Sequence, residues 1–288
     1  MTLGQLRISR RSIGMAAALA GTVSLAIGAH AALSLRALDA AKAVATEQAS
    51  ESVGKGSRLA LIIGNGHYPD ASEPLGQPIN DARALTGALR RDGFDVDVVE
   101  DAGKDDMTRA IDRLKSKIKS DSVVMLFFGG YGVQIGRESY MIPVDATIWK
   151  ESDVRREGLS VESVLDVMKA HGARAKLVVI DASRRNPYER RFRAFSHGLA
   201  PINAPDNALI LSSATPGKVA EDSSSQNSVL VGELLNHLNA KPVGAEAAFN
   251  KTRVAISRAS DGEQVPSVSS SLLEDVRFGT AATENAGS

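Results

Sequence analysis

Residues 176–187, KLVVIDASRRNP, form the stretch that decides the fold. The apolar residues 177–180 run without a polar interruption and stop at Asp181, Ala182 and Ser183. A short β-branched run without alternation is typical of a strand buried on both faces, in the middle of a parallel sheet. In such sheets, ligands and catalytic groups gather beyond the carboxyl ends of the strands. Asp181 and Ser183 are therefore candidate site residues.

A second apolar run, residues 123–128, ends in the same way and continues into Gly129, Gly130, Tyr131 and Gly132. Glycines let the backbone turn sharply and pass close to other groups, and Tyr131 is the side chain that they present. If the two strands are neighbours in the sheet, Tyr131 and Ser183 face each other across a crevice.

The composition excludes several classes of function. Lys plus Arg and Asp plus Glu number 34 each, so the chain lacks the basic excess of a typical nucleic-acid-binding protein. The chain has no cysteine, which excludes disulfides, thiolate metal sites and a thiol nucleophile. No His, Asp or Glu residues show metal-ligand spacing and no glycine-rich phosphate loop opens a helix, so we expect no cofactor.

The first 36 residues read as an export signal or signal anchor. Arg7, Arg10 and Arg11 precede the uncharged, weakly apolar residues 12–35, and the paired arginines resemble a twin-arginine signal. Residues 12–35 are also long enough to tether the protein to the membrane if they are not cleaved. The alternative is a buried N-terminal helix. We expect a periplasmic protein, or one anchored on the outer side of the cytoplasmic membrane.

Residues 37–57 read as a polar linker, residues 58–279 as one domain, and residues 280–288 as a disordered tail. Within the domain, strands alternate with helices, which predicts an α/β fold with a mostly parallel sheet of about six strands and helices on both faces. The expected strands are 59–63, 94–99, 123–128, 177–180, 208–212 and 275–278. The expected helices are 79–91, 105–119, one capped by Ser160 that includes 161–168, 229–238 and 245–259.

Ser183 has no obvious catalytic partner. A serine nucleophile needs a base within hydrogen-bond reach, and Tyr131 is a poor one, because ionising a phenol near neutral pH costs about 4 kcal/mol. No Gly-x-Ser-x-Gly or Ser-x-x-Lys motif surrounds Ser183. His67 is the one histidine in an expected strand-end loop and could approach the site, although a solvated loop residue is the favoured interpretation.

Seven ordered pieces of the chain match one family. They are LIIGN (61–65), INDA (79–82), FFGGYGVQ (127–134), YMIPVDA (140–146), VIDASRRNP (179–187), ATPGKVA (214–220), and QVP (264–266) with SSSL (269–272). On these pieces, residues 59–279 resemble the caspase-like peptidases, peptidase C14, in particular bacterial metacaspase or orthocaspase relatives. The resemblance implies a three-layer caspase-like fold.

The departures from the family pattern fall on its catalytic pair. The place of the catalytic histidine holds Tyr131, and the place of the catalytic cysteine holds Ser183. The resemblance therefore implies an inactive pseudopeptidase that binds a basic peptide or protein partner. The alternatives are an endopeptidase that uses Ser183 with Tyr131, and a structural partner of an active paralogue.

Two further positions match residues that form an acidic pocket for a basic side chain in the metacaspases. They are Asp81 and Asp181, which the resemblance assigns to substrate binding, whereas helix-start and strand-end capping are their alternative roles. Gly129 replaces a serine that is frequent in the family, and no calcium site can be carried over.

The loop after Ser183 is basic. Its arginines are Arg184, Arg185, Arg190, Arg191 and Arg193. They could bind an acidic partner or fold over the cleft to neutralise Asp81 and Asp181, but a solvated basic loop is the favoured interpretation.

Overall fold

The computed structural model describes residues 56–69, 74–184, 188, 198–220, 225–239 and 242–279. The chain divides into two compact units, Met1–Gly56 and Ser57–Ser288, and the fold lies in the second. The predicted export signal, residues 37–55 of the linker and the predicted tail lie outside the described residues. Within the described ranges, no helix is both long and apolar enough to cross a membrane.

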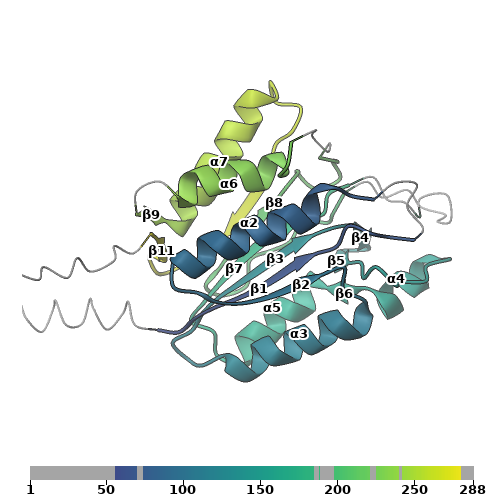
Figure 1. Cartoon of the computed structure of the whole chain (residues 1–288), viewed down its shortest axis with the longest axis horizontal. Coiled ribbons are helices and arrows are strands. Elements are labelled where there is room, and N and C mark those ends of the chain that lie inside the picture. Colours follow the sequence, from purple (N-terminus) through teal and green to yellow (C-terminus); the bar gives the residue numbers. More distant parts are fainter. Residues whose placement is uncertain are drawn as a thin grey trace, which may run out of the picture. The chain divides into compact units, whose positions relative to one another are not determined.

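A six-stranded sheet with the order β10-β8-β7-β3-β1-β2 forms the middle layer (Figure 1). Its parallel strands are β1 (Arg58–Gly64), β2 (Asp95–Glu100), β3 (Val123–Gly129), β7 (Ala175–Asp181) and β8 (Ala208–Ser212). The edge strand β10 (Ser267–Ser270) pairs with β8 in the antiparallel sense. The predicted mostly parallel α/β sheet is confirmed.

Strands β3 and β7 lie side by side at the centre of the sheet, and all seven residues of each are buried. Both faces of these strands pack against other elements, which explains why residues 123–128 and 177–180 are apolar without alternation. The register places Phe128 opposite Ile180 and Gly129 opposite Asp181, so the two strands end level with each other.

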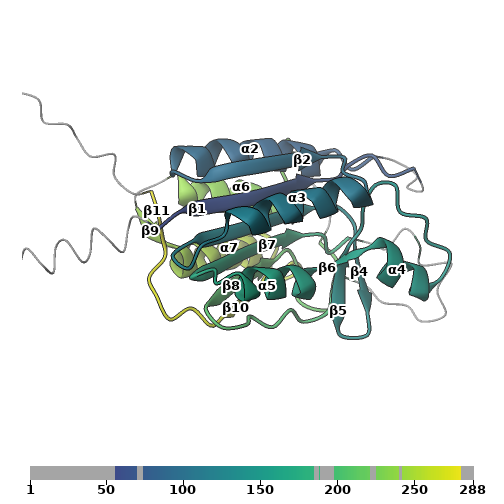
Figure 2. The same ribbon diagram turned by 90° about the horizontal axis from the view of Figure 1, so that it is seen from below.

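Helices cover both faces of the sheet (Figures 1 and 2). Helices α2 (Gln77–Arg91), α6 (Val229–Leu238) and α7 (Ala245–Ala259) pack on one face. Helices α3 (Lys104–Lys117) and α5 (Val161–Ala170) pack on the other. Each places an apolar stripe on the sheet, as Ala82, Leu85 and Leu89 do in α2. Ser160 caps α5 as predicted, because its hydroxyl accepts a hydrogen bond from the Ser163 N–H.

Several short elements were not resolved by the sequence pattern. A three-stranded antiparallel sheet consists of β4 (Gly132–Ile135), β5 (Glu138–Met141) and β6 (Leu159–Ser160), with helix α4 (Glu151–Glu157) between β5 and β6. The strand expected at 275–278 is wrong in extent and place: β11 (Arg277–Phe278) pairs only with β9 (Val243–Gly244), and β10 completes the central sheet. The apolar Phe278 of this segment is buried against Phe94 and does not belong to the central sheet.

Candidate functional site

Backbone hydrogen bonds connect the segments that follow β1, β3 and β7, beyond the last paired residues of these strands. Asn65 N–H donates to the Gly129 carbonyl (2.9 Å), Gly130 N–H to the Asp181 carbonyl (3.3 Å), and Gly132 N–H to the Ala182 carbonyl (3.1 Å). These bonds hold Tyr131 beside the segment that carries Asp181 and Ser183. The neighbouring strand ends therefore bring the candidate residues to one edge of the sheet.

Tyr131 packs into an aromatic cluster at this edge. Its ring lies edge-on to Tyr68 at a centroid distance of 4.8 Å, and its N–H donates to the Tyr68 hydroxyl (3.1 Å). That hydroxyl donates to the Ile142 carbonyl (2.9 Å), and burial raises the pKa of Tyr68. A Cβ at Gly130 would lie 2.5 Å from the Tyr68 oxygen, so this position needs glycine. Tyr131 is held as a packing residue.

Ser183 is sealed in the structure. The residue is 1% exposed, and its hydroxyl has no hydrogen-bond partner among the described residues, so Tyr131 does not bond to it. Its N–H donates to the Ser213 hydroxyl (3.4 Å), and its carbonyl accepts from the Ala220 N–H (2.7 Å). A nucleophilic hydroxyl needs a base and access to substrate, and in this conformation Ser183 has neither within the described part of the chain.

Asp81, in the second turn of α2, is buried with one oxygen bound and one unpartnered. Its Oδ1 accepts from the Asn227 side-chain amide (2.9 Å) and from the Ser228 N–H (3.0 Å). Its Oδ2 has no hydrogen-bond partner among the described residues. Burial, followed by the negative charge of Asp181, raises the pKa of Asp81 to about 6. The two predicted pocket carboxylates are thus close enough to interact.

Asp181 is buried at the end of β7 and lies beside Arg184. One guanidinium nitrogen of Arg184 is 3.8 Å from Asp181 Oδ1, and the same nitrogen donates to the Asp181 carbonyl and to the Gly130 carbonyl (3.0 Å). Asp181 Oδ2 has no hydrogen-bond partner in the described part of the chain. Arg184 is 5% exposed, so the favoured interpretation of a solvated arginine was wrong for this residue. The other four arginines of the loop lie outside the described residues.

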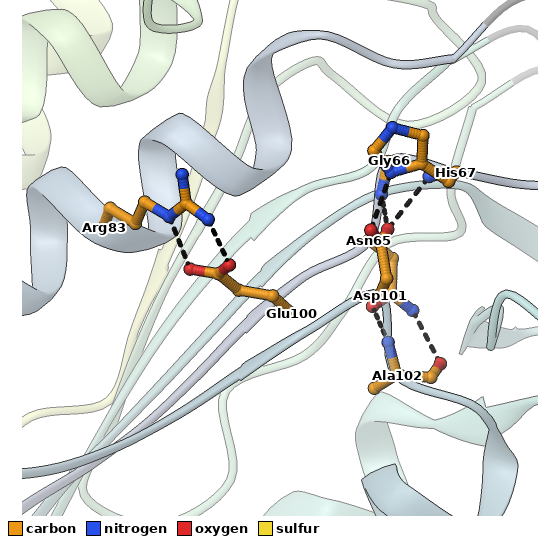
Figure 3. Close-up of polar contacts among 7 residues, drawn as sticks. All are labelled: Asn65, Gly66, His67, Arg83, Glu100, Asp101 and Ala102. Atoms are coloured by element: carbon orange, nitrogen blue, oxygen red, sulfur yellow. Dashed lines mark hydrogen bonds and ion pairs between the residues drawn. The ribbon is translucent and has the colours of Figure 1, made fainter.

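His67 lies on the surface beyond β1 and is engaged by Asp101 (Figure 3). Its side chain is 65% exposed, and its Nδ1 is 2.6 Å from Asp101 Oδ2. Asp101 Oδ1 accepts from the N–H groups of Gly66 and His67, both at 2.9 Å. Burial acts to raise the pKa of Asp101, but these backbone bonds and His67 outweigh it and lower the pKa. His67 is therefore paired with Asp101 and makes no hydrogen bond to the Ser183 hydroxyl.

Three polar residues that support the site were missed by the sequence reasoning. Asn65 is fully buried and joins two segments: its side chain accepts from the Ala102 N–H (2.8 Å) and donates to the carbonyls of Ala102 (3.2 Å) and Ile142 (3.3 Å) (Figure 3 shows the Ala102 pair). Asn227 and Ser228 orient Asp81. The available signal was Ser228 directly before an apolar run, the pattern of a helix cap, which it forms for α6.

No group of three or more His, Asp or Glu residues within the described ranges could hold a metal ion. The groups at this edge that could bind a ligand are the two buried carboxylates and the residues that hydrogen-bond to them.

The sequence profile of peptidase C14, described as the caspase domain, matches residues 57–277. This chain belongs to the caspase domain family. The fold agrees with the family: the crystal structure of Caspase-1 from Spodoptera frugiperda superposes with a TM-score of 0.60, covering 79% of this chain and 93% of the other at 16% identity. At that identity the likeness concerns the fold alone.

Two curated relatives of this caspase domain are much longer proteins. Mucosa-associated lymphoid tissue lymphoma translocation protein 1 from Homo sapiens is 29% identical over 134 residues, which is 46% of this chain. Its homolog from Mus musculus is 29% identical over 145 residues, which is 50% of this chain. The matched segments span only 16% and 17% of the length of these relatives.

Proposed function

We propose that this caspase domain is a pseudopeptidase of the bacterial metacaspase type that binds a basic peptide or protein partner without cleaving it. In this proposal Tyr131 and Ser183 occupy the positions of the family histidine and cysteine, and Asp81 and Asp181 provide the binding carboxylates. The observation that carries the proposal is the buried Ser183 hydroxyl, which has no hydrogen-bond partner among the described residues.

The environment of both dyad positions argues against peptidase chemistry. A base must ionise or accept a proton near neutral pH, and a tyrosine starts from a pKa of about 10. Tyr131 lies against Tyr68 in a cluster of apolar and aromatic side chains, which does not favour an ionised phenol. With no cysteine anywhere in the chain, a thiol cannot replace Ser183 from another position.

The carboxylates argue for a basic ligand. Buried polar groups are normally hydrogen-bonded, yet one oxygen of Asp81 and one of Asp181 have no partner among the described residues. Both carboxylates are buried, so a ligand reaches them when this edge of the sheet opens. An arginine or lysine side chain would then supply the missing donors and a positive charge in addition to that of Arg184. Asn227 and Ser228 hold the other oxygen of Asp81, and so they fix the orientation of the carboxylate toward such a ligand.

The place of action in this proposal is outside the cytoplasm. The basic head and uncharged core of residues 1–36 support export, either as a cleaved signal with a periplasmic product or as an anchor on the outer side of the cytoplasmic membrane.

The binding proposal is tested by calorimetric titration of the full chain with acetyl-glycyl-arginine amide. The matched control ligand is the citrulline analogue, which has the same shape without the charge. We expect saturable binding of the arginine peptide alone, weakened at least about tenfold by Asp181→Asn, the loss expected when a charge-assisted hydrogen bond is weakened. Equal affinity for the two peptides, or unchanged affinity in the variant, would contradict the proposal.

The absence of cleavage is tested separately with fluorogenic peptides that end in arginine or lysine. We expect no turnover by the wild-type protein and no labelling of Ser183 by a serine-directed phosphonate. Turnover that disappears in Ser183→Ala would show instead that the chain is a serine peptidase on a caspase scaffold.

A further inference from the structure

Arg184 is an arginine in an unusual position, because this residue type is rarely buried and Arg184 is 5% exposed. It follows Ser183 directly, and its side chain turns back toward the end of β7. One of its nitrogens reaches oxygens from two strands, the Gly130 carbonyl at the end of β3 and the Asp181 carbonyl at the end of β7, and lies 3.8 Å from Asp181 Oδ1. A guanidinium group therefore already lies beside one of the two site carboxylates.

We propose that Arg184 is an internal ligand of the acidic site and competes with an external basic side chain for Asp181. This inference rests on the proposed function and adds its regulation: the site is occupied by the chain itself until Arg184 moves away. A guanidinium is the group that the site would recognise in a partner, and Arg184 offers it without the cost of association.

The two site carboxylates have a positively charged neighbour among the described residues, Arg184. Asp81 and Asp181 carry two negative charges when both are ionised, and of these two carboxylates Arg184 is paired with Asp181. The second carboxylate, Asp81, is buried and accepts hydrogen bonds from two neutral donors, the Asn227 amide and the Ser228 N–H. An external arginine that displaced Arg184 would meet both unpartnered Oδ2 atoms, so the hydrogen bonds that Arg184 gives up could be replaced by better ones.

Competition of this kind lowers the apparent affinity. When the internal ligand leaves the site open in about one molecule in ten, an external ligand binds about tenfold more weakly than it would to a permanently open site. Removal of the charge on Arg184 also deprives Asp181 of this cation, which strengthens its attraction for an external one.

The test compares the full-length wild type with Arg184→Gln by calorimetric titration with acetyl-glycyl-arginine amide. Glutamine keeps an N–H donor for the strand-end carbonyls, so the fold should be retained, and Arg184→Met serves as a second variant without any donor. We expect Arg184→Gln to bind the arginine peptide at least about tenfold more tightly than the wild type. Addition of Asp181→Asn to Arg184→Gln should abolish this gain.

Three results would separate this inference from the proposed function. Asp181-dependent binding by the wild type that is equal or weaker in both Arg184 variants would overturn the internal ligand and leave the binding function intact. Binding by none of the proteins would overturn both. Tighter binding by Arg184→Gln that persists in the double variant with Asp181→Asn would also refute the competition, because the gain would not arise at Asp181.

Discussion

Replacement of Asp81 by asparagine should stabilise the folded protein at neutral and alkaline pH. The side chain is fully buried, and ionisation there is opposed by burial and by Asp181. Asparagine keeps the oxygen that accepts from Asn227 and Ser228. Its amide nitrogen would replace the unpartnered Oδ2, so the variant removes a buried charge without removing the hydrogen bonds that orient the residue.

The size of the effect follows from the pKa of Asp81. A pKa of about 6 in the folded protein, against 3.8 ordinarily, corresponds to about 3 kcal/mol of unfolding free energy. Because the folded state binds this proton more tightly, the wild type is not penalised below pH about 4 and loses stability as the pH rises through about 6. The variant should escape this loss, so its advantage should grow from near zero at pH 4 to about 3 kcal/mol at pH 8.

Urea unfolding of both proteins at pH 4, 6 and 8 measures this difference. A suitable control is Asp95→Asn, since Asp95 is an exposed carboxylate paired with Lys117 at 2.7 Å and should change stability by less than about 1 kcal/mol. A stability gain in Asp81→Asn that does not change with pH would refute the argument that ionisation of buried Asp81 destabilises the fold. A variant less stable than the wild type at pH 8 would refute it as well. The same substitution should weaken peptide binding, as expected where a functional charge is retained at a cost in stability.

Two further predictions concern the scaffold of the site. Asn65→Ala should lower the unfolding free energy in urea by about 2–4 kcal/mol, because it leaves buried backbone groups unpaired. Asn80→Ala, at a half-buried position, should cost less than about 1 kcal/mol. Gly130→Ala should lower the melting temperature by pushing the Tyr68 hydroxyl away, and Tyr68→Phe should cost less in that background than in the wild type. Gly87→Ala, which meets only a flexible arginine end, should be neutral or stabilising.

The central strands and the long helices could be predicted because their patterns are strong. The fully buried β3 and β7 contain the continuous apolar runs 123–128 and 177–180, and the expected bounds of β8, α6 and α7 agree with the structure. The short edge strand β10 was missed because its sequence SVSS has only one apolar residue, so nothing marks it as part of a sheet. Its pairing depends on the exposed edge of β8, which is a tertiary contact.

The position of the candidate site in the fold could be predicted from the sequence, but the burial and contacts of its side chains could not. The topology brings the ends of β3 and β7 together, so Tyr131 and Ser183 lie at one edge of the sheet. The crevice expected between them stays a prediction. Contacts between segments far apart in the sequence determine three features of the site. They are the burial of Ser183, the hydrogen bond from Arg184 to the Gly130 carbonyl, and the hydrogen bond from Asn227 to Asp81. Such contacts leave no periodic pattern, and a basic loop residue is solvated in most proteins.

The burial of Ser183 has a consequence for any reactive side chain placed at this position. Residue 183 is held on both sides of its Cα, because its N–H donates to the Ser213 hydroxyl and its carbonyl accepts from the Ala220 N–H. A cysteine placed there would inherit the same burial. Substrate access to a reactive side chain at residue 183 would require the surrounding loops to repack first, so packing, and not the identity of one side chain, limits what this position can do.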